Sequence, residues 1–425
     1  LVSGESLVRQ LLYGQRYTQE KFGAIAKVAW LTDSFGFSWQ LPQIFAQSGI
    51  EYFVTGKLHW NDRTTFPHGC FWWQSPDGTR LLTLMSPPNV TGVMDTNPSA
   101  IADCAIAWEN QTGLKDAFWL PGVGDRGGGP SRDMLEVQQR WQNSPFFPRM
   151  EFATALEYLQ EIGKEARNSL PTWDDELYLE FHRGCYTTHA DQKRFNRYCE
   201  GLLYQAELFA SLAHLIHEKG VSRAAPFPIF QYNTKQLNSQ GVKEKIEQAW
   251  KQVLFNQFHD ILPGTSIPEV FVEANQGWQE VIAIGEEILT ESLQAIASQI
   301  DFPGPPHPEA KPILIFNPLN WKRSEVVSVS VPSENWAIYN LQGEEVPSQL
   351  CDRDRLLFLA SGISSVGYHL FWLCPKEDRE PQRHRGAQEE FVLENEELRA
   401  IIDPETGDLS SIFDKIHQRE VLRGA

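Results

Sequence analysis

The chain contains 425 residues, of which 41% are hydrophobic and 22% are charged, and these values are ordinary for folded globular proteins. A chain of this length is expected to form two or three domains. Its net charge of −18, from 37 Lys and Arg against 55 Asp and Glu, repels phosphate backbones and anionic lipid surfaces. The composition therefore excludes nucleic acid and membrane partners, whereas a neutral ligand would not be repelled.

The cysteine pattern bears on the cellular compartment. Six cysteines are scattered along the chain without the paired spacing of zinc fingers or redox motifs. Reduced thiols in a cytoplasmic protein are the simplest interpretation. The N-terminus shows no basic segment followed by an apolar one, and no apolar run reaches the ~18 residues that a membrane span needs. We therefore expect neither secretion nor membrane spanning.

Residues 1–188 alternate helical periodicity with short β-rich runs, which predicts an α/β domain forming part of a β/α barrel. Strands are expected at 27–31, 50–55, 71–74, 79–84 and 118–120. The third and fourth strands flank Ser75-Pro76-Asp77-Gly78, whose Pro and Gly positions favour a type I turn and hence a hairpin. Helices are expected around Leu7, Leu11 and Leu12 and over residues 41–45, the latter closed by Gly49.

After residue 188 the periodicity becomes that of long amphipathic helices, and we expect a three-helix bundle over residues 189–300. The third helix is expected to begin at Ser266, where Ser266 and Glu269 fit a capping box and Pro268 fits the first turn. The predicted buried faces are Leu202, Ala206, Phe209, Ala213 and Ile216 in the first helix and Ile246, Trp250, Val253 and Leu254 in the second.

Residues 301–311 form a proline-rich linker, and beyond it the hydrophobicity alternates with a period of two. Glu325, Val327, Val329 and Val331 fall on one face of the first strand, and Val326, Ser328 and Ser330 on the other. We expect a β-sandwich domain over residues 301–425, with a solvated loop at 376–385 and a hairpin turn at 403–408. This domain is expected to be incomplete, because a sandwich usually needs about seven strands.

Asp33 follows the predicted strand 27–31, and a glycine, Gly36, lies three residues later. Barrel enzymes place catalytic groups at the C-terminal ends of strands, where the sheet holds them rigidly. Asp33 is therefore a candidate catalytic carboxylate. A purely structural alternative is that Asp33 caps the helix that follows.

Two further segments carry acidic residues near glycines or aromatic side chains. Four carboxylates occur within Asp174–Glu180, and glycoside hydrolysis needs a paired acid and nucleophile, so this cluster supplies candidates for the acid. A solvated acidic loop is the alternative for most of them. Asp125 lies in the glycine-rich stretch 122–130, which lacks a nucleotide-binding fingerprint and better suits contact with a sugar hydroxyl.

His259 and Asp260 close the second predicted bundle helix and precede a Pro-Gly turn. A metal ligand at this position would be anchored by packed turns of helix behind it. His259 can equally be a cation that interacts with the helix dipole, so the pair alone does not define a metal site. The 14 tryptophans are ambiguous in the same way, because such rings line sugar sites but more often pack in cores.

Taken together, these segments resemble glycoside hydrolase family 38, especially its cytosolic and bacterial α-mannosidase branch. The resemblance covers essentially the whole chain, and the joint match is specific although each motif alone is moderate. The segments that carry it are Gly4–Gln10, Asp33–Ser38, Lys57–Asn61, Phe71–Trp73, the glycine-rich stretch with Asp125, Glu176–Gly184, Asn256–Asp260, Leu393–Glu396 and Ser411–Lys415.

The resemblance implies a retaining exo-α-mannosidase that removes terminal α-linked mannose from an oligosaccharide through a covalent intermediate. It implies that Asp33 is both the nucleophile and a zinc ligand, that His259 is a second zinc ligand, and that the acid/base catalyst is Glu176, with Asp175 and Glu180 as alternatives. Residues expected to contact substrate are Asp125, Asp260, Trp60, Trp72, Arg183 and Tyr186; packing is the alternative for Trp60, Trp72 and Trp73.

The family's other two zinc ligands come from a His-x-Asp motif on the first barrel strand, and no histidine precedes His59 here. We therefore expect the chain to be truncated at both ends relative to a full enzyme, with two ligands supplied upstream. Because a zinc site needs its full ligand set, this piece alone is expected to bind zinc weakly and to turn over little substrate.

Two other functions and several properties stay open at this point. A non-catalytic carbohydrate-binding module would keep the fold without a working metal centre. Another metal-dependent barrel hydrolase would need closely spaced histidines, which the first 58 residues lack. Linkage preference is undetermined, as is the choice between a monomer and a homo-oligomer, and carboxylate and imidazole ligands accept cobalt as well as zinc.

Overall fold

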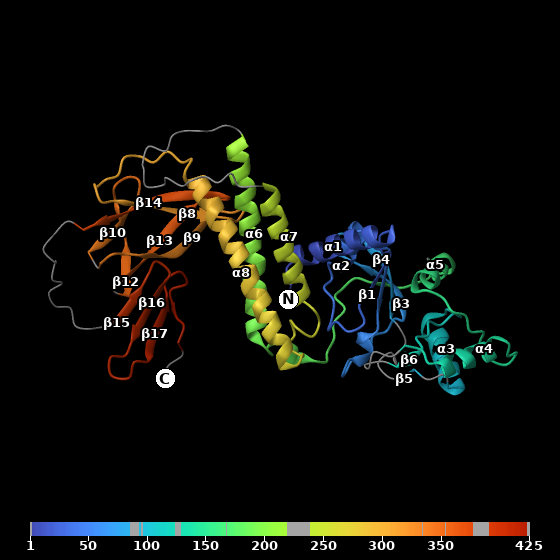
Figure 1. Ribbon diagram of the computed structural model, residues 1–425. Helices are drawn as coiled ribbons and strands as arrows, with labels where there is room; N and C mark the ends of the chain where they lie inside the picture. Colours follow the sequence, from blue (N-terminus) through green and yellow to red (C-terminus); the bar gives the residue numbers. More distant parts are fainter. Residues whose placement is uncertain are drawn as a thin grey trace. The chain divides into compact units, whose positions relative to one another are not determined.

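The computed structural model describes residues 2–85, 93–94, 97–123, 129–166, 168–218, 239–333, 335–352, 354–376 and 391–422. The chain divides into two compact units, Leu1–Asp301 and Phe302–Ala425, so the boundary falls within the predicted proline-rich linker (Figure 1). The first unit contains an α/β part and three long helices, and the described part of the second is built from strands. A further domain boundary at residue 188 stays a prediction.

The α/β part is built on a five-stranded sheet with the order β1-β2-β4-β3-β7. Strands β1, β2 and β4 run parallel, β3 is antiparallel to β4, and β7 is parallel to β3. Their bounds are Val28–Trp30 (β1), Tyr52–Thr55 (β2), Cys70–Gln74 (β3), Arg80–Met85 (β4) and Thr172–Trp173 (β7). The four predicted strands between residues 27 and 84 are confirmed, including the hairpin, where Gly78 N donates to Ser75 O. In the described residues this sheet is open and does not close into a barrel.

Helices connect and flank this sheet. They are Gly4–Phe22 (α1), Leu41–Gln47 (α2), Pro98–Thr112 (α3), Arg132–Gln142 (α4) and Ala155–Glu165 (α5), with 3₁₀ turns at Lys57–Trp60 (η1) and Arg183–Tyr186 (η2) and a two-stranded pair of Val93–Met94 (β5) and Gly122–Val123 (β6). Helices α1 and α2 match the predicted ones, and Gly49 follows α2 with a left-handed φ of 87°. The strand predicted at 118–120 is wrong: Phe118 packs its ring against Trp30 and Tyr158 outside any strand.

Both faces of the sheet are buried, which explains why its strands are continuously apolar. Phe53 and Trp73 belong to one core cluster with Phe37 and Phe71, while the neighbouring Val54 belongs to a second cluster with Leu82 and Leu159. Trp72 packs against this second cluster. The sheet is therefore a rigid platform whose loops can hold side chains at defined positions.

The predicted three-helix bundle is confirmed as Ala190–Glu218 (α6), Ser239–Asn256 (α7) and Pro268–Ala297 (α8). Trp250 and Trp278 are fully buried in its core, and the predicted faces of the first two helices point inward, with Ile216 at their partly exposed end. The predicted capping box is wrong, because Ile267 is the N-cap of α8 and makes no side-chain cap bond. Ser266 lies one residue before this N-cap, and its backbone N–H donates to Asp260 O.

Helix α1 is joined to the bundle through a buried carboxylate. Glu200, whose side chain is 4% exposed, accepts hydrogen bonds from Ser3 N and from Ser6 Oγ, at 2.8 and 2.6 Å. Gln257, just after α7, donates to the same Glu200 oxygen at 3.2 Å and to Ser6 Oγ at 3.0 Å. Residues from the start and the middle of the chain therefore share one polar cluster.

The second unit contains two sheets that face each other. Strands Lys311–Asn317 (β8), Trp336–Tyr339 (β10), Glu345–Val346 (β11) and Gly367–Pro375 (β14) form a sheet ordered β11-β10-β14-β8; Arg323–Ser330 (β9), Ser348–Asp352 (β12) and Arg355–Ile363 (β13) form a second, ordered β12-β13-β9. Their inner side chains share one core cluster, as in a β-sandwich. Val327 and Val329 point into it whereas Val326 is exposed, which confirms the period-two prediction for β9.

A further sheet of the second unit contains Phe391–Glu394 (β15), Leu398–Ile402 (β16), Leu409–Asp414 (β17) and Arg419–Glu420 (β18). The turn predicted at 403–408 joins β16 to β17, whose antiparallel pairing confirms the hairpin. The predicted solvated loop at 376–385 lies outside the described residues after Lys376. None of the helices in the described residues combines the length and apolar composition that crossing a bilayer requires.

Candidate active site

Two chemically important side chains follow neighbouring parallel strands. Asp33 lies three residues after β1, and Lys57 lies two residues after β2, so both are at the C-terminal edge of the sheet. The helix α2 has Gln40 as its N-cap, so Asp33 does not cap it and the structural alternative for Asp33 is wrong. A sheet edge of this kind is where α/β enzymes gather their reactive groups.

Asp33 and Lys57 form an ion pair with 2.9 Å between Lys57 Nζ and Asp33 Oδ1. The Lys57 side chain is only 7% exposed, whereas Asp33 is 41% exposed and can be reached from solvent. The ammonium group also lies 4.0 Å from the centre of the Trp60 ring and 5.7 Å from that of Phe35. The Asp33 carboxylate is therefore accessible to solvent and is paired with a buried cation, Lys57.

The pKa of Asp33 is lowered below its ordinary value. Partial burial is the largest effect and raises the pKa, but the hydrogen bond and charge of Lys57 and the charge of His259 together outweigh it. The His259 side chain, 226 residues further along the chain, is thus within electrostatic reach of Asp33. Asp33 is ionised at neutral pH, as a nucleophile or a metal ligand must be.

Gly36 explains how the Asp33 loop meets the acidic segment. Its φ of 105° is open only to glycine, and a Cβ there would lie 3.2 Å from Leu177 O. The close approach lets Phe37 and Leu177 exchange two backbone hydrogen bonds, with Leu177 N donating to Phe37 O at 3.0 Å and Phe37 N to Leu177 O at 2.8 Å. Residue 176 is therefore brought next to the loop that carries Asp33.

Glu180 has a structural task. Its carboxylate accepts the backbone N–H groups of Arg63 and Thr64 at 2.7 and 2.9 Å, while its own N–H donates to Asn61 Oδ1 at 2.9 Å. The bonds from Thr64 and Arg63 lower the pKa of Glu180 to about 2. A carboxyl group with this pKa carries no proton at neutral pH, so Glu180 fits poorly as a general acid.

Glu176 is exposed, and its backbone is held by an aromatic side chain. The indole N–H of Trp173 donates to Glu176 O at 3.0 Å, and that of Trp73 donates to Asp175 O at 2.9 Å. The phenol of Tyr186 interacts electrostatically with Glu176. Burial, Tyr178 and Glu176 all raise the pKa of Tyr186. The side chains of Glu176 and Tyr186 therefore lie near each other.

The structure adds His182, which sequence reasoning missed. It adopts a left-handed backbone with φ 59°, unusual for a residue with a side chain, and such outliers concentrate at functional sites. Its ring lies against Phe35, with centroids 4.9 Å apart, and against Trp60, at 5.8 Å. Burial and the charge of Lys57 lower the pKa of His182, so this imidazole is neutral. The sequence signal was its place inside the Glu176–Gly184 motif.

His259 and Asp260 lie beyond α7, not within its last turn as predicted, because α7 ends at Asn256. The following N–H groups bond three residues back, as in Phe258 N to Phe255 O, which tightens the chain into successive turns. His259 Nε2 lies 3.5 Å from Asp260 Oδ2, and Asp260 Oδ1 accepts the Thr265 hydroxyl at 2.6 Å. His259 lies three residues beyond the end of α7, so the alternative of a cation that interacts with the helix dipole stays open.

The other predicted substrate contacts differ in position. Trp60 lies in the cluster around Lys57, whereas Trp72 and Trp73 pack in the two cores of the sheet, the alternative role considered for them. Arg183 is exposed and lies 3.9 Å from Asp62. Asp125 lies outside the described residues.

Among the described residues, no group of three or more His, Cys, Asp or Glu side chains is arranged to hold a metal ion. Asp33 and His259 offer a carboxylate and an imidazole, which suit zinc, but two donors do not make a complete set. The described residues therefore fit a metal site only in part. All six cysteines are unpaired, in agreement with the expectation of reduced thiols.

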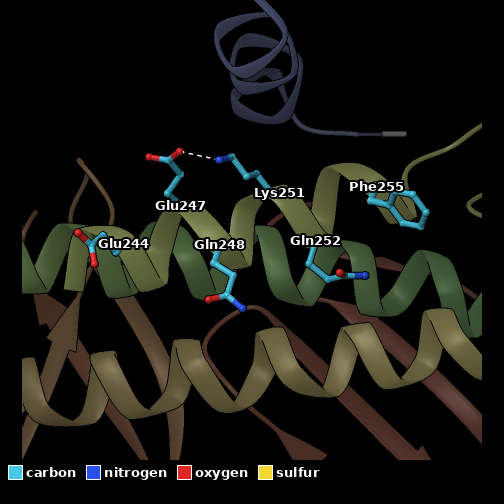
Figure 2. A pocket seen from close by; sticks show the side chains of 6 residues that line it. All are labelled: Glu244, Glu247, Gln248, Lys251, Gln252 and Phe255. Atoms are coloured by element: carbon cyan, nitrogen blue, oxygen red, sulfur yellow. Dashed lines mark ion pairs between the residues drawn. The ribbon is translucent and has the colours of Figure 1, made fainter. Parts of the chain in front are cut away.

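An open hollow of about 580 Å³ lies elsewhere, along one face of α7. Figure 2 shows its lining side chains and the ion pair between Glu247 and Lys251, 2.8 Å apart. The lining residues are Glu244, Glu247, Gln248, Lys251, Gln252 and Phe255, at the spacing of a single helix face. None of the candidate catalytic residues belongs to it, so the sheet edge around Asp33 is the better candidate site.

Comparison with known families identifies two matching domain models. Residues 1–176 match the Glycosyl hydrolases family 38 N-terminal domain, and residues 180–296 match the Alpha mannosidase middle domain. The two matches meet within the segment that carries Glu176 and His182. The chain belongs to glycosyl hydrolase family 38.

Curated relatives extend the comparison. The chain is 36% identical to human Alpha-mannosidase 2C1 over 332 residues, which is 78% of this chain and 29% of that protein. It is 33% identical to the Alpha-mannosidase of Saccharomyces cerevisiae over 335 residues, 77% of this chain and 28% of the relative. The chain thus spans less than a third of the length of these relatives.

A solved structure shares the fold. An alpha-mannosidase from Enterococcus faecalis V583 aligns with a TM-score of 0.70 at 18% sequence identity, covering 99% of this chain and 51% of the other. At this identity the likeness concerns the fold alone.

Proposed function

We propose that this chain carries the reaction site of a retaining exo-α-mannosidase, with Asp33 as the nucleophile. The observation that carries the proposal is the ion pair of the half-exposed Asp33 carboxylate with buried Lys57 at the C-terminal edge of the sheet. A carboxylate that is ionised, accessible and held from behind is what a double-displacement glycosidase needs. The relatives named as alpha-mannosidases point to terminal α-linked mannose as the sugar.

In the first step, an Asp33 oxygen forms a bond to the anomeric carbon while the glycosidic bond breaks. The leaving oxygen takes a proton from a carboxylic acid, for which we propose Glu176, with Asp175 as the alternative. In the second step, the same group removes a proton from water, which attacks the anomeric carbon and releases Asp33. Two inversions restore the α configuration of the mannose.

We also propose that the reaction uses a zinc ion. Asp33 and His259 would supply two donors for the ion, and the charge of His259 contributes to the lowered pKa of Asp33. Such an ion would supply a positive charge for binding the hydroxyl groups of a sugar. The residues of this chain hold the carboxylate ionised and position the imidazole whether or not the ion is present.

For substrate contacts we propose Trp60, Asp260, Arg183, Tyr186 and Asp125. Trp60 offers an aromatic ring next to Lys57, the ion-pair partner of Asp33, and Tyr186 offers a hydroxyl near Glu176. Trp72 is left out because it packs against a core of the sheet. The natural partner would be a mannose-containing oligosaccharide in the cytoplasm, and assembly into a homo-oligomer is compatible with the proposal.

The test uses the full-length protein, an aryl α-mannoside and a fluorinated mannosyl analogue that traps the intermediate. We expect the trap to label Asp33, and Asp33→Asn to lower kcat by more than about 1,000-fold. The product should first appear as α-mannose in an NMR time course. Label on another residue, or β-mannose as first product, refutes the proposal. Mannose binding without turnover that persists in excess chelator would instead indicate a carbohydrate-binding module.

A further inference from the structure

Lys57 is a buried cation next to the candidate nucleophile. Its side chain is 7% exposed, and it follows β2 at the start of the η1 turn. Lysine is among the residues that are least often buried, because removing its charge from water costs several kcal/mol. Replacing a buried ion pair by apolar residues of similar volume is often neutral or stabilising, so stability alone is a weak reason for a buried cation at this position.

The surroundings of Lys57 fix the position of its ammonium group. The Trp60 ring lies 4.0 Å from Nζ on one side and the Phe35 ring lies 5.7 Å away. A cation over an aromatic face is attracted to it, most strongly when both are shielded from water. Both rings also contact the His182 ring, so the aromatic enclosure is itself packed.

The ammonium group acts on only one oxygen of Asp33. Nζ lies 2.9 Å from Oδ1, whereas Oδ2 makes a longer contact of 3.4 Å with the Thr32 hydroxyl. A charge-assisted hydrogen bond of this length is directional. It therefore sets the rotation of the carboxylate and distinguishes its two oxygens.

We propose that Lys57 is a positioning residue for Asp33: the Trp60 and Phe35 rings fix the ammonium group, and the ammonium group fixes the orientation of the attacking carboxylate. This inference rests on the proposed function, because it concerns the reaction of Asp33. The chain keeps a buried charge at this place because a misplaced reacting atom slows the chemical step more than it weakens substrate binding.

The test compares variants of the full-length protein with the aryl α-mannoside as substrate. Lys57→Met removes the charge and keeps the length, and Lys57→Arg restores a cation. Lys27→Met is the control. Lys27 also forms an ion pair with a carboxylate, that of Glu51 at 2.6 Å, but it lies away from the candidate site. If Lys57→Met does not melt cooperatively, Lys57→Gln replaces it, since it lacks the charge but keeps a hydrogen-bond donor.

We expect the neutral variant to lower kcat by about 100-fold with KM changed less than about threefold. Lys57→Arg should recover at least about tenfold of that loss, and Lys27→Met should match the wild type. A folded neutral variant with unchanged kcat overturns the inference, as does an arginine variant that is no better than the neutral one. Asp33→Asn, measured alongside, separates the two proposals: if it stays active, the proposed function fails, whatever Lys57 does.

Discussion

The indole N–H of Trp173 donates to the backbone carbonyl of Glu176, 3.0 Å away, and thereby holds the chain at the candidate acid. The preceding carbonyl, that of Asp175, is held in the same way by the indole of Trp73. Two successive peptide groups are therefore fixed by aromatic side chains, while the Glu176 side chain itself remains exposed. A rigid backbone below a free carboxyl group suits proton transfer to a bound leaving group.

Replacing Glu176 by Gln is expected to lower kcat for a natural glycoside by about 100- to 10,000-fold, because the leaving oxygen then receives no proton. With dinitrophenyl α-mannoside, whose leaving group needs no proton, the first step should be close to that of the wild type. The kcat/KM values for the two substrates, which report the first step alone, check this. Asp175→Asn is the control, and equal losses with both substrates would contradict the assignment of Glu176.

Glu180 is expected to make stability depend on acid pH. Its pKa is about 2 in the folded chain against an ordinary value of 4.5, so the folded state favours the charged form. The stabilisation by Glu180 is therefore complete above about pH 4.5 and is lost as the pH falls toward 2. Urea unfolding of the wild type and of Glu180→Gln, at pH 6 and near pH 3, measures this difference. A stability gap that is the same at both pH values would show that the backbone bonds from residues 63 and 64 do not depend on the charge.

Gly36→Ala is expected to destabilise the chain more than Gly78→Ala does. Both glycines have positive φ, 105° and 85°, but a Cβ at Gly36 meets Leu177 O at 3.2 Å whereas that at Gly78 meets open space. Gly78→Ala should lose about 1 to 2 kcal/mol from the left-handed backbone alone. Gly36→Ala should lose about 1 to 3 kcal/mol more, through forced movement of the 177 segment. Denaturant melts compare the two; equal losses would mean that the close approach is unimportant.

Glu200 and Glu207 provide a matched pair on α6, since both bind groups on α1. Glu200 is 4% exposed and Glu207 is 42% exposed. Glu200→Ala removes the acceptor of Ser3 N and of the Ser6 hydroxyl, and one of the acceptors of Gln257, and is expected to lower the free energy of unfolding by about 2 to 5 kcal/mol. Glu207→Ala removes a surface ion pair and should lose about 1 kcal/mol or less. Similar losses in both variants would contradict the importance of the buried cluster.

Much of the fold was predictable because its signals are local. The strands β1 to β4 and the helices α6 to α8 follow from periodicity and from Gly and Pro positions, which depend on neighbouring residues alone. The strand predicted at 118–120 is wrong because the apolar Phe118 packs against Trp30 and Tyr158 from a segment that is not a strand. The capping box predicted at Ser266 is wrong because the Ser266 N–H donates to the carbonyl of Asp260, six residues earlier, and so does not bind the Glu269 side chain.

The candidate site was predictable only in part. Asp33 could be recognised because a strand end is a local feature with a general meaning. Lys57 and His182 could not, because what distinguishes them is the set of rings and charges around them, which comes from three separate segments. Glu180 looked like one acid among four, and its role emerged only from the N–H groups of residues 63 and 64.

The hydrogen bond from Gln257 to Ser6 spans 251 residues of sequence. At a synthesis rate of 5 to 20 residues per second, helix α1 must wait roughly 13 to 50 s on the ribosome before this partner is made. Gln257 lies between α7 and α8, so this bond can form only after α7 has been synthesised. Helix α1 therefore spends this interval without one of its permanent hydrogen-bond partners.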